Sequence, residues 1–201
     1  MTDYRNDIEK AIVEFEGLLK QVKRDGIDNL ISFIRKSDFY TAPASTRYHS
    51  SYNGGLLIHS LNVYDRLYQI LRNDEAWYQN GKTYSDETII IVALLHDICK
   101  TFFYKETTRN QKNEETGKWE KVPYYIVEDK FAFGHSEKSV FMIERYMKLT
   151  KEEAMAIRWH MGFTEPKDNW NYLSAAIAQY PLALAVHIAD LEATYLLEGE
   201  S

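Results

Sequence analysis

Apolar residues recur three and four positions apart along much of this chain, which is the spacing of one buried face of an α-helix. The spacing predicts an amphipathic helix over residues 7–23 and, after Gly26, a shorter helix over residues 27–35. Gly54 and Gly55 precede a third helical stripe over residues 56–71. The first two helices carry no side chains that indicate chemistry, so we expect them only to pack.

The most apolar segment, residues 89–95, runs directly into His96 and Asp97. Ser85 is a suitable N-cap for this helix, which we expect to extend far enough to carry both polar residues. An imidazole and a carboxylate buried side by side cost several kcal/mol unless they are neutralised. A bound divalent cation would neutralise them, but a His–Asp ion pair that only joins two helices is the alternative, and the dipeptide alone leaves both open.

Other histidines and one more aspartate fall on or beside apolar helical stripes. Taken singly, a histidine there is more often a core or helix-entry residue than a ligand. Where a histidine and an aspartate lie three residues apart they share a helix face, and both a His–Asp pair and a metal ligand stay open. These residues are His59 in the helix over residues 56–71, His135 after Gly134, His160 in the helix from Thr150 to Gly162, and His187 and Asp190 in the helix that begins at Pro181.

The periodicity changes between residues 102 and 131, where Thr, Tyr, Val and Phe alternate loosely with charged residues. This pattern predicts a β-hairpin with strands over residues 103–112 and 119–127 and a turn near Gly117. Its mixed charges indicate a solvent-exposed flap. Because a two-stranded hairpin is marginal alone, we expect it to lie on the helical body or on another subunit.

Together the elements predict an all-α fold, a bundle of about seven helices with one inserted β-hairpin. We expect a single domain over residues 1–201, in which residues 1–43 form an N-terminal helical extension and residues 101–131 the hairpin insertion. A chain of 201 residues that is 45% hydrophobic suits one compact core.

Composition narrows the function classes. The net charge of −6 argues against binding of long nucleic acids, although a short strand or a nucleotide in a local pocket remains open. The single cysteine, Cys99, excludes an internal disulfide and a Cys-based zinc site, and it fits a reducing compartment. No signal segment and no membrane span is evident, so we expect a cytoplasmic protein that does not bind membranes.

The helical periodicity also fails over residues 37–55, where Ser, Thr, Pro and Gly accumulate as in a loop. This loop contains Arg47 and His49, which would suit contact with an anionic ligand. A solvated surface loop is the alternative.

Four of the polar residues would form a site of two imidazoles and two carboxylates drawn from three helices, namely His59, His96, Asp97 and Asp190. That donor set suits Mn, Fe, Co, Ni or Zn better than Ca. His135 and His160 would hold a second ion, with Asp97 bridging the two. Paired ions about 3.5–4 Å apart typically bind a phosphate oxygen and produce a hydroxide nucleophile near neutral pH.

The order His59, His96-Asp97 and Asp190 resembles the HD superfamily of metal-dependent phosphohydrolases, and the added His135 and His160 resemble its two-metal subset. The phrases RYHSSYNGGLLIHSLNV, ALLHDICK, FGHSE and RWHMG are similar to the HD domain of bacterial 3′–5′ exoribonucleases over residues 44–197. The expected fold is therefore an HD-domain helical bundle.

The resemblance implies a role for each matching residue. It makes His59, His96, Asp97 and Asp190 ligands of a first metal ion and His135 and His160 ligands of a second. Lys100 becomes a contact to phosphate, and Arg47 and His49 fall in a basic loop that faces substrate. The chain departs from the pattern at Cys99, where the family usually has Gly, and at Met161, where relatives often have a second His. It also has helix and loop where the exoribonucleases have a nucleic-acid-binding OB barrel.

The leading hypothesis is a metal-dependent phosphohydrolase that cleaves a phosphoester or phosphoanhydride bond in a nucleotide or short phosphodiester. Such an enzyme would be a phosphomonoesterase, phosphodiesterase or nucleotidase, with Asp97 and Lys100 as its catalytic residues. A 3′–5′ exonuclease on short single strands is one alternative, and a non-catalytic metal- or nucleotide-binding regulatory module is another. The hairpin also leaves a homodimer open.

Overall fold

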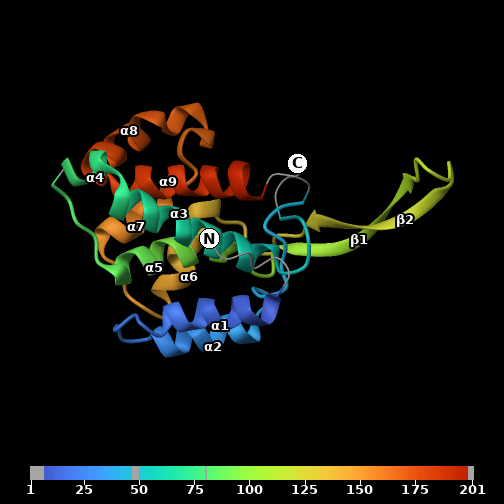
Figure 1. The fold of residues 1–201 in the computed structure, drawn as a ribbon, viewed down its shortest axis with the longest axis horizontal. Helices are drawn as coiled ribbons and strands as arrows, with labels where there is room; N and C mark the ends of the chain where they lie inside the picture. Colours follow the sequence, from blue (N-terminus) through green and yellow to red (C-terminus); the bar gives the residue numbers. More distant parts are fainter. Residues whose placement is uncertain (1–6, 47–49, 80, 199–201) are drawn as a thin grey trace.

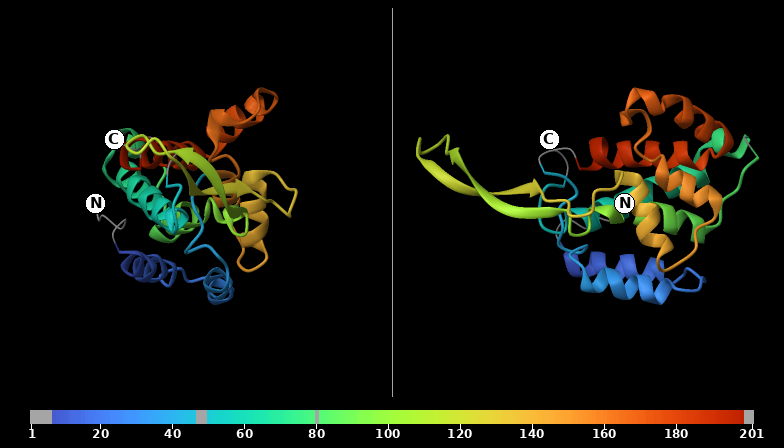
Figure 2. Two further views of the ribbon diagram at one scale, coloured as in Figure 1. Left: turned by 90° about the vertical axis from the view of Figure 1, so that its right-hand side faces the viewer. Right: turned by 180° about the vertical axis from the view of Figure 1, so that it is seen from behind.

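The computed structural model describes residues 7–46, 50–79 and 81–198, which form a helical body with one long hairpin (Figure 1). Helices α3 (Gly55–Asn73) and α5 (Asp86–Leu95) lie in the middle of the body. Helix α9 (Leu182–Glu192) packs along α3 on one side, and two N-terminal helices cover the opposite side (Figures 1 and 2). The other described helices are α1 (Ile8–Leu19), α2 (Ile27–Lys36), α4 (Glu75–Gln79), α6 (His135–Glu144), α7 (Lys151–Arg158) and α8 (Trp170–Gln179).

This arrangement confirms the predicted helical fold with an inserted hairpin. Two of the described helices, α4 and α8, were not expected from the sequence. Helix α8 buries only Leu173 and Ala176, so its apolar face is too sparse to give a clear periodic signal. In the part of the chain that the structure describes, no single helix is both long and apolar enough to span a membrane, and one bent pair, Lys167–Gln179 with Leu182–Leu197, meets that test only when its halves are combined.

Burial explains why α5 is central. The side chains from Ile89 to Leu95 are each at most 1% exposed, so neighbouring helices cover every face of α5. The predicted N-cap is confirmed, because Oγ of Ser85 accepts a hydrogen bond from the backbone N–H of Thr88 at 3.1 Å. Helix α7 likewise begins with the expected cap at Thr150, which forms a capping box with Glu153.

Two helices end earlier than the sequence predicts. Helix α5 ends at Leu95, before His96 and Asp97, and α7 ends at Arg158, before His160. In each case the histidine Nδ1 donates to a carbonyl three residues earlier, at 2.8 Å for His96 and 2.7 Å for His160. Because that carbonyl lies in the last turn of the helix, the side chain competes with continued backbone bonding, and a turn follows.

Strands β1 (Tyr104–Lys112) and β2 (Trp119–Val127) form the predicted antiparallel hairpin. The turn contains Gly117 at φ 68°, a conformation that favours glycine. Most of the hairpin projects away from the helical body (Figures 1 and 2), although the Tyr104 hydroxyl at its base donates to the Ala44 carbonyl at 3.1 Å. The hairpin therefore does not lie on the helical body, and its contact with another subunit stays a prediction.

Candidate metal centre

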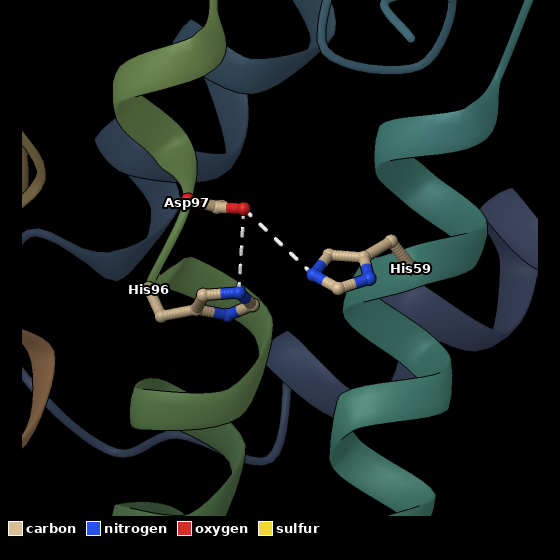
Figure 3. Close-up of side chains that lie close together, drawn as sticks. All are labelled: His59, His96 and Asp97. Atoms are coloured by element: carbon tan, nitrogen blue, oxygen red, sulfur yellow. Dashed lines mark ion pairs between the residues drawn. The ribbon is translucent and has the colours of Figure 1, made fainter. Parts of the chain in front are cut away.

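The six predicted metal ligands meet in one region of the helical body. His59 projects from α3, and His96 and Asp97 follow the end of α5 (Figure 3). His135 is the first residue of α6, His160 lies just after α7, and Asp190 lies in α9. Residues from five helices that are distant in sequence therefore contribute to a single cluster.

The end of α5 determines how two neighbouring residues face the same cavity. We expected His96 and Asp97 on one helix, about 100° apart around its axis. Instead Asp97 has left the helix, with φ −107° and ψ 17°, and a short 3₁₀ turn, Ile98–Lys100, follows. The turn places Oδ2 of Asp97 3.4 Å from Nε2 of His96 (Figure 3).

Asp97 lies between two pairs of imidazoles. Its Oδ2 atom is 3.7 Å from Nε2 of His59, on the same side as His96 (Figure 3). Its Oδ1 atom is 2.9 Å from Nε2 of His135 and 3.6 Å from Nε2 of His160. Each carboxylate oxygen thus faces a different pair, which is the arrangement required of a carboxylate that bridges two ions.

Asp190 completes the cluster from α9. Its Oδ1 atom lies 3.2 Å from Nε2 of His59. Three overlapping sets of residues each offer ligand atoms within 4.8 Å of one another, a spacing that a single ion can span. The sets are His59, His96 and Asp97; His96, His160 and Asp190; and Asp97, His135 and His160.

The hydrogen bonds of two imidazoles indicate which ring nitrogen is free to bind a cation. Because Nδ1 of His96 and of His160 donates to a backbone carbonyl, the neutral form of each ring carries its lone pair on Nε2. Both Nε2 atoms are buried and have no hydrogen-bond partner among the described residues. Buried nitrogen lone pairs aimed at a carboxylate suit a divalent cation, so the residues fit the metal that the sequence predicts.

The buried charges also shift one another's pKa values. Burial lowers the pKa of His59, but the carboxylates of Glu198 and Asp190 outweigh it and raise the pKa to about 10. Burial likewise opposes protonation of His135, but the hydrogen bond to Asp97 prevails and raises its pKa to about 9. Burial favours the neutral form of Asp97, yet the surrounding positive groups hold its pKa well below its ordinary value. The site therefore attracts positive charge, and protons compete with metal ions for it.

Lys100 lies against the same carboxylate. Its Nζ atom is 2.6 Å from Oδ2 of Asp97, and both side chains are largely buried. Burial lowers the pKa of Lys100, but the charge of Asp97 outweighs it and raises the pKa above its ordinary value. Lys100 therefore keeps its positive charge at neutral pH.

A cavity of about 480 Å³ opens next to the cluster. Asp97, Lys100 and His135 contribute polar atoms to its lining. Most of the lining surface is apolar, and Met161 contributes to it. The other lining residues are Thr164, His187, Asp190, Leu191, Thr194 and Tyr195.

Four other residues singled out in the sequence have different outcomes. His187 lines the cavity, but its Nδ1 donates to the backbone carbonyl of His160 at 2.8 Å, so it supports the chain beside a candidate ligand. Arg47 and His49, predicted to bind substrate, lie outside the described residues. Cys99 adopts the 3₁₀ turn without a left-handed backbone, and its buried Sγ lies 3.3 Å from Nδ1 of His135.

Sequence reasoning missed Glu198. Its buried carboxylate lies 3.1 Å from Nδ1 of His59 and also accepts hydrogen bonds from Ser50 and Asn62. Neither helical periodicity nor a motif distinguishes this glutamate. The only available signal was the buried histidine itself, whose second nitrogen requires an acceptor.

The fold and the site define a helical domain that gathers imidazoles and carboxylates around a candidate metal centre. Residues 56–194 match the HD domain family, and the chain therefore belongs to this family. The HD superfamily consists of metal-dependent phosphohydrolases, and the buried His/Asp groups fit a site for divalent metal. Comparisons with curated proteins and with solved structures found no match.

Proposed function

We propose that this protein is a metal-dependent phosphohydrolase that cleaves a phosphoester or phosphoanhydride bond in a nucleotide or a short phosphodiester. The main support is the position of Asp97, whose two oxygens face two different pairs of imidazoles. His59, His96, Asp97 and Asp190 would hold the first ion, and His135 and His160 would hold a second that shares Asp97. Mn, Fe, Co, Ni and Zn all suit these ligands.

The reaction depends on two residues that line the cavity, Asp97 and Lys100. When bound, divalent ions polarise a phosphate oxygen and lower the pKa of a coordinated water. Asp97 orients the attacking water through its carboxylate. Lys100, held against Asp97 and lining the cavity, offsets the negative charge that grows on the phosphate oxygens in the transition state.

The cavity supports a nucleotide as the substrate. A volume of about 480 Å³ is within the range of small-molecule sites, and its largely apolar lining includes the charged groups of Asp97, Lys100 and Asp190. The phosphate would contact Lys100, and the base would contact the apolar lining residues Met161 and Leu191. Arg47 and His49, which precede α3, would add contacts to the phosphate or sugar.

Metal analysis of the purified protein, followed by a panel of phosphate substrates, tests this function. We expect bound transition metal and release of phosphate, pyrophosphate or nucleotide, with both lost in Asp97→Asn. The exposed Asp168 provides the control, because Asp168→Asn should leave both unchanged. Turnover that survives Asp97→Asn, or wild-type protein that binds no metal, would reject the proposal.

The same panel separates the two alternatives. Cleavage of short single strands with mononucleotides left intact would identify an exonuclease. Thermal stabilisation by a nucleotide without any turnover would identify a regulatory module.

We also propose that the hairpin contacts a second copy of the chain. The support is exposed apolar surface on its second strand, where Trp119 is 71% and Val127 55% exposed. Light scattering of wild type and Trp119→Ala tests this: we expect a dimer that the substitution weakens, and a monomeric wild type would reject it.

A further inference from the structure

The carboxylate of Glu198 lies on the side of His59 that faces away from the cluster. Its Oε1 and Oε2 atoms are 3.1 and 3.2 Å from Nδ1 of His59. Nδ2 of Asn62 donates to Oε1 at 2.9 Å, and Oγ of Ser50 donates to Oε2 at 2.7 Å. A fully buried carboxylate thus has three hydrogen-bond donors directed at it.

We propose that Glu198 is a positioning residue that prepares His59 to bind the metal ion. By accepting the hydrogen from Nδ1, Glu198 fixes the tautomer in which Nε2 carries the lone pair and aims it at Asp97 and Asp190. A carboxylate behind an imidazole also makes the ring a stronger donor to a cation. This inference rests on the proposed metal centre and adds a residue outside the six candidate ligands.

A purely structural role explains the burial of Glu198 poorly. Burying a carboxylate is costly unless a positive group compensates for its charge. Within residues 7–46, 50–79 and 81–198, no Lys or Arg forms an ion pair with Glu198, and its only titratable partner is His59. Among the described residues, His59 is therefore the group that can compensate this charge, when it is protonated or bound to a cation.

Glu198 also connects His59 to the loop before α3. Ser50 has φ 46°, a left-handed backbone that is unfavourable for a residue other than glycine. A Cβ at Gly55 would lie 1.9 Å from the Ser50 carbonyl oxygen, so the two segments approach closely there. The bond from Ser50 to Glu198 helps to hold this conformation. Ser50, which directly follows His49 in the sequence, and the proposed metal ligand His59 therefore share one carboxylate.

Binding of Co²⁺ tests the proposal without any substrate. The affinity of the metal-free protein would be measured by competition with a chelator, and the ligand geometry by the visible absorption of the bound ion. We expect Glu198→Gln to weaken binding about 10-fold and Glu198→Ala up to about 100-fold, with an altered Co²⁺ spectrum. Gln keeps an acceptor for Nδ1 but loses the charge, which explains the order.

Glu192 provides the matched control, because it is the last residue of α9, six positions before Glu198 in the sequence, and pairs with Arg66 at 2.6 Å. Glu192→Gln should bind Co²⁺ as wild type does. A lower melting temperature in Glu198→Gln with unchanged Co²⁺ affinity would show a structural role and overturn the proposal, as would an equal loss in Glu192→Gln. If Glu198→Ala does not fold, the Co²⁺ affinities of Glu198→Gln and Ser50→Ala decide between a positioning role and a structural role. Wild-type protein that binds no Co²⁺ or other transition metal would instead reject the metal centre, and the role of Glu198 with it.

Discussion

The ammonium group of Lys100 lies 2.6 Å from Oδ2 of Asp97, the same oxygen that faces His59 and His96. Lys100 therefore competes with a cation for this carboxylate, although it is also the positive group best placed to meet a phosphate. These two roles have opposite consequences for metal binding and for turnover. Replacing Lys100 separates them.

Lys100→Met removes the positive charge but keeps much of the apolar stem. We expect the metal affinity to stay equal or to rise, because a competing cation is gone. We expect kcat to fall about 10²- to 10³-fold, because a donor that stabilises transition-state charge is lost. Chelator competition and steady-state kinetics measure the two effects, with Lys105→Met in the exposed hairpin as the control. A variant that loses metal and activity together would contradict this division.

Metal binding should depend on pH because of two raised pKa values. The pKa of His59 is raised to about 10 and that of His135 to about 9. Before a metal binds, both nitrogens of each ring therefore carry a proton at pH 7, and the rings are positively charged. Binding requires the free lone pair, so the ions must displace these protons and the affinity should rise as the pH increases from about 6 to 9. Calorimetry in buffers of different ionisation enthalpy would count the released protons, and His135→Asn should release one fewer. An affinity that does not change over this pH range would contradict the prediction.

Much of the fold was predictable because its signals are local. Ser85 and Thr150 mark helix starts through their own side-chain hydrogen bonds, and Gly117 marks the hairpin turn through its backbone. Convergence of the histidines followed from a different argument, since polar groups on apolar helix faces need partners in the core. Asp97 and Asp190 do have such partners in the structure.

Features that depend on distant contacts were not predictable. The end of α5 before His96 has no Gly or Pro to mark it, because it depends on the side-chain bond from His96 to the Ala93 carbonyl. Glu198 contacts Asn62 and Ser50 across 136 and 148 residues of sequence. No periodicity links positions so far apart, and only the folded chain reveals the contact.

Glu153 is the basis of a prediction about stability. Its fully buried carboxylate accepts hydrogen bonds from two nitrogens of Arg24, at 2.6 and 2.7 Å, and one from the Thr88 hydroxyl at 2.9 Å. It therefore joins the segment after α1 to α5 and α7. Glu153→Ala would leave Arg24 with Glu87 as its remaining carboxylate partner.

We expect Glu153→Ala to lower the free energy of unfolding by about 3 kcal/mol, because removing one member of a buried ion pair leaves the other poorly compensated. Urea denaturation would measure the change. Lys151→Ala, at an exposed position of the same helix, should change it by less than about 0.5 kcal/mol. A loss below about 1 kcal/mol for Glu153→Ala would show that Glu87 alone compensates Arg24.

Gly162 lies two residues after His160 and packs closely against the ring of His187, which lines the cavity. Its φ is 54°, and a Cβ added there would lie 2.4 Å from three ring atoms of His187. The same His187 ring donates to the His160 carbonyl at 2.8 Å. A side chain at Gly162 would therefore push His187 away and disturb the chain that carries a candidate ligand.

Gly162→Ala should combine a backbone cost of about 1 kcal/mol with a steric clash, and it should weaken metal binding through His160. Gly117→Ala separates the two effects, since Gly117 also has a positive φ, 68°, but nothing lies within 4 Å of its added Cβ. That variant should lose stability and keep its metal affinity. The double variant Gly162→Ala/His187→Ala removes the clashing ring and should be more stable than Gly162→Ala alone. If the double variant is no more stable in urea denaturation, the ring of His187 is not what restricts this position to glycine, and the backbone conformation alone accounts for it.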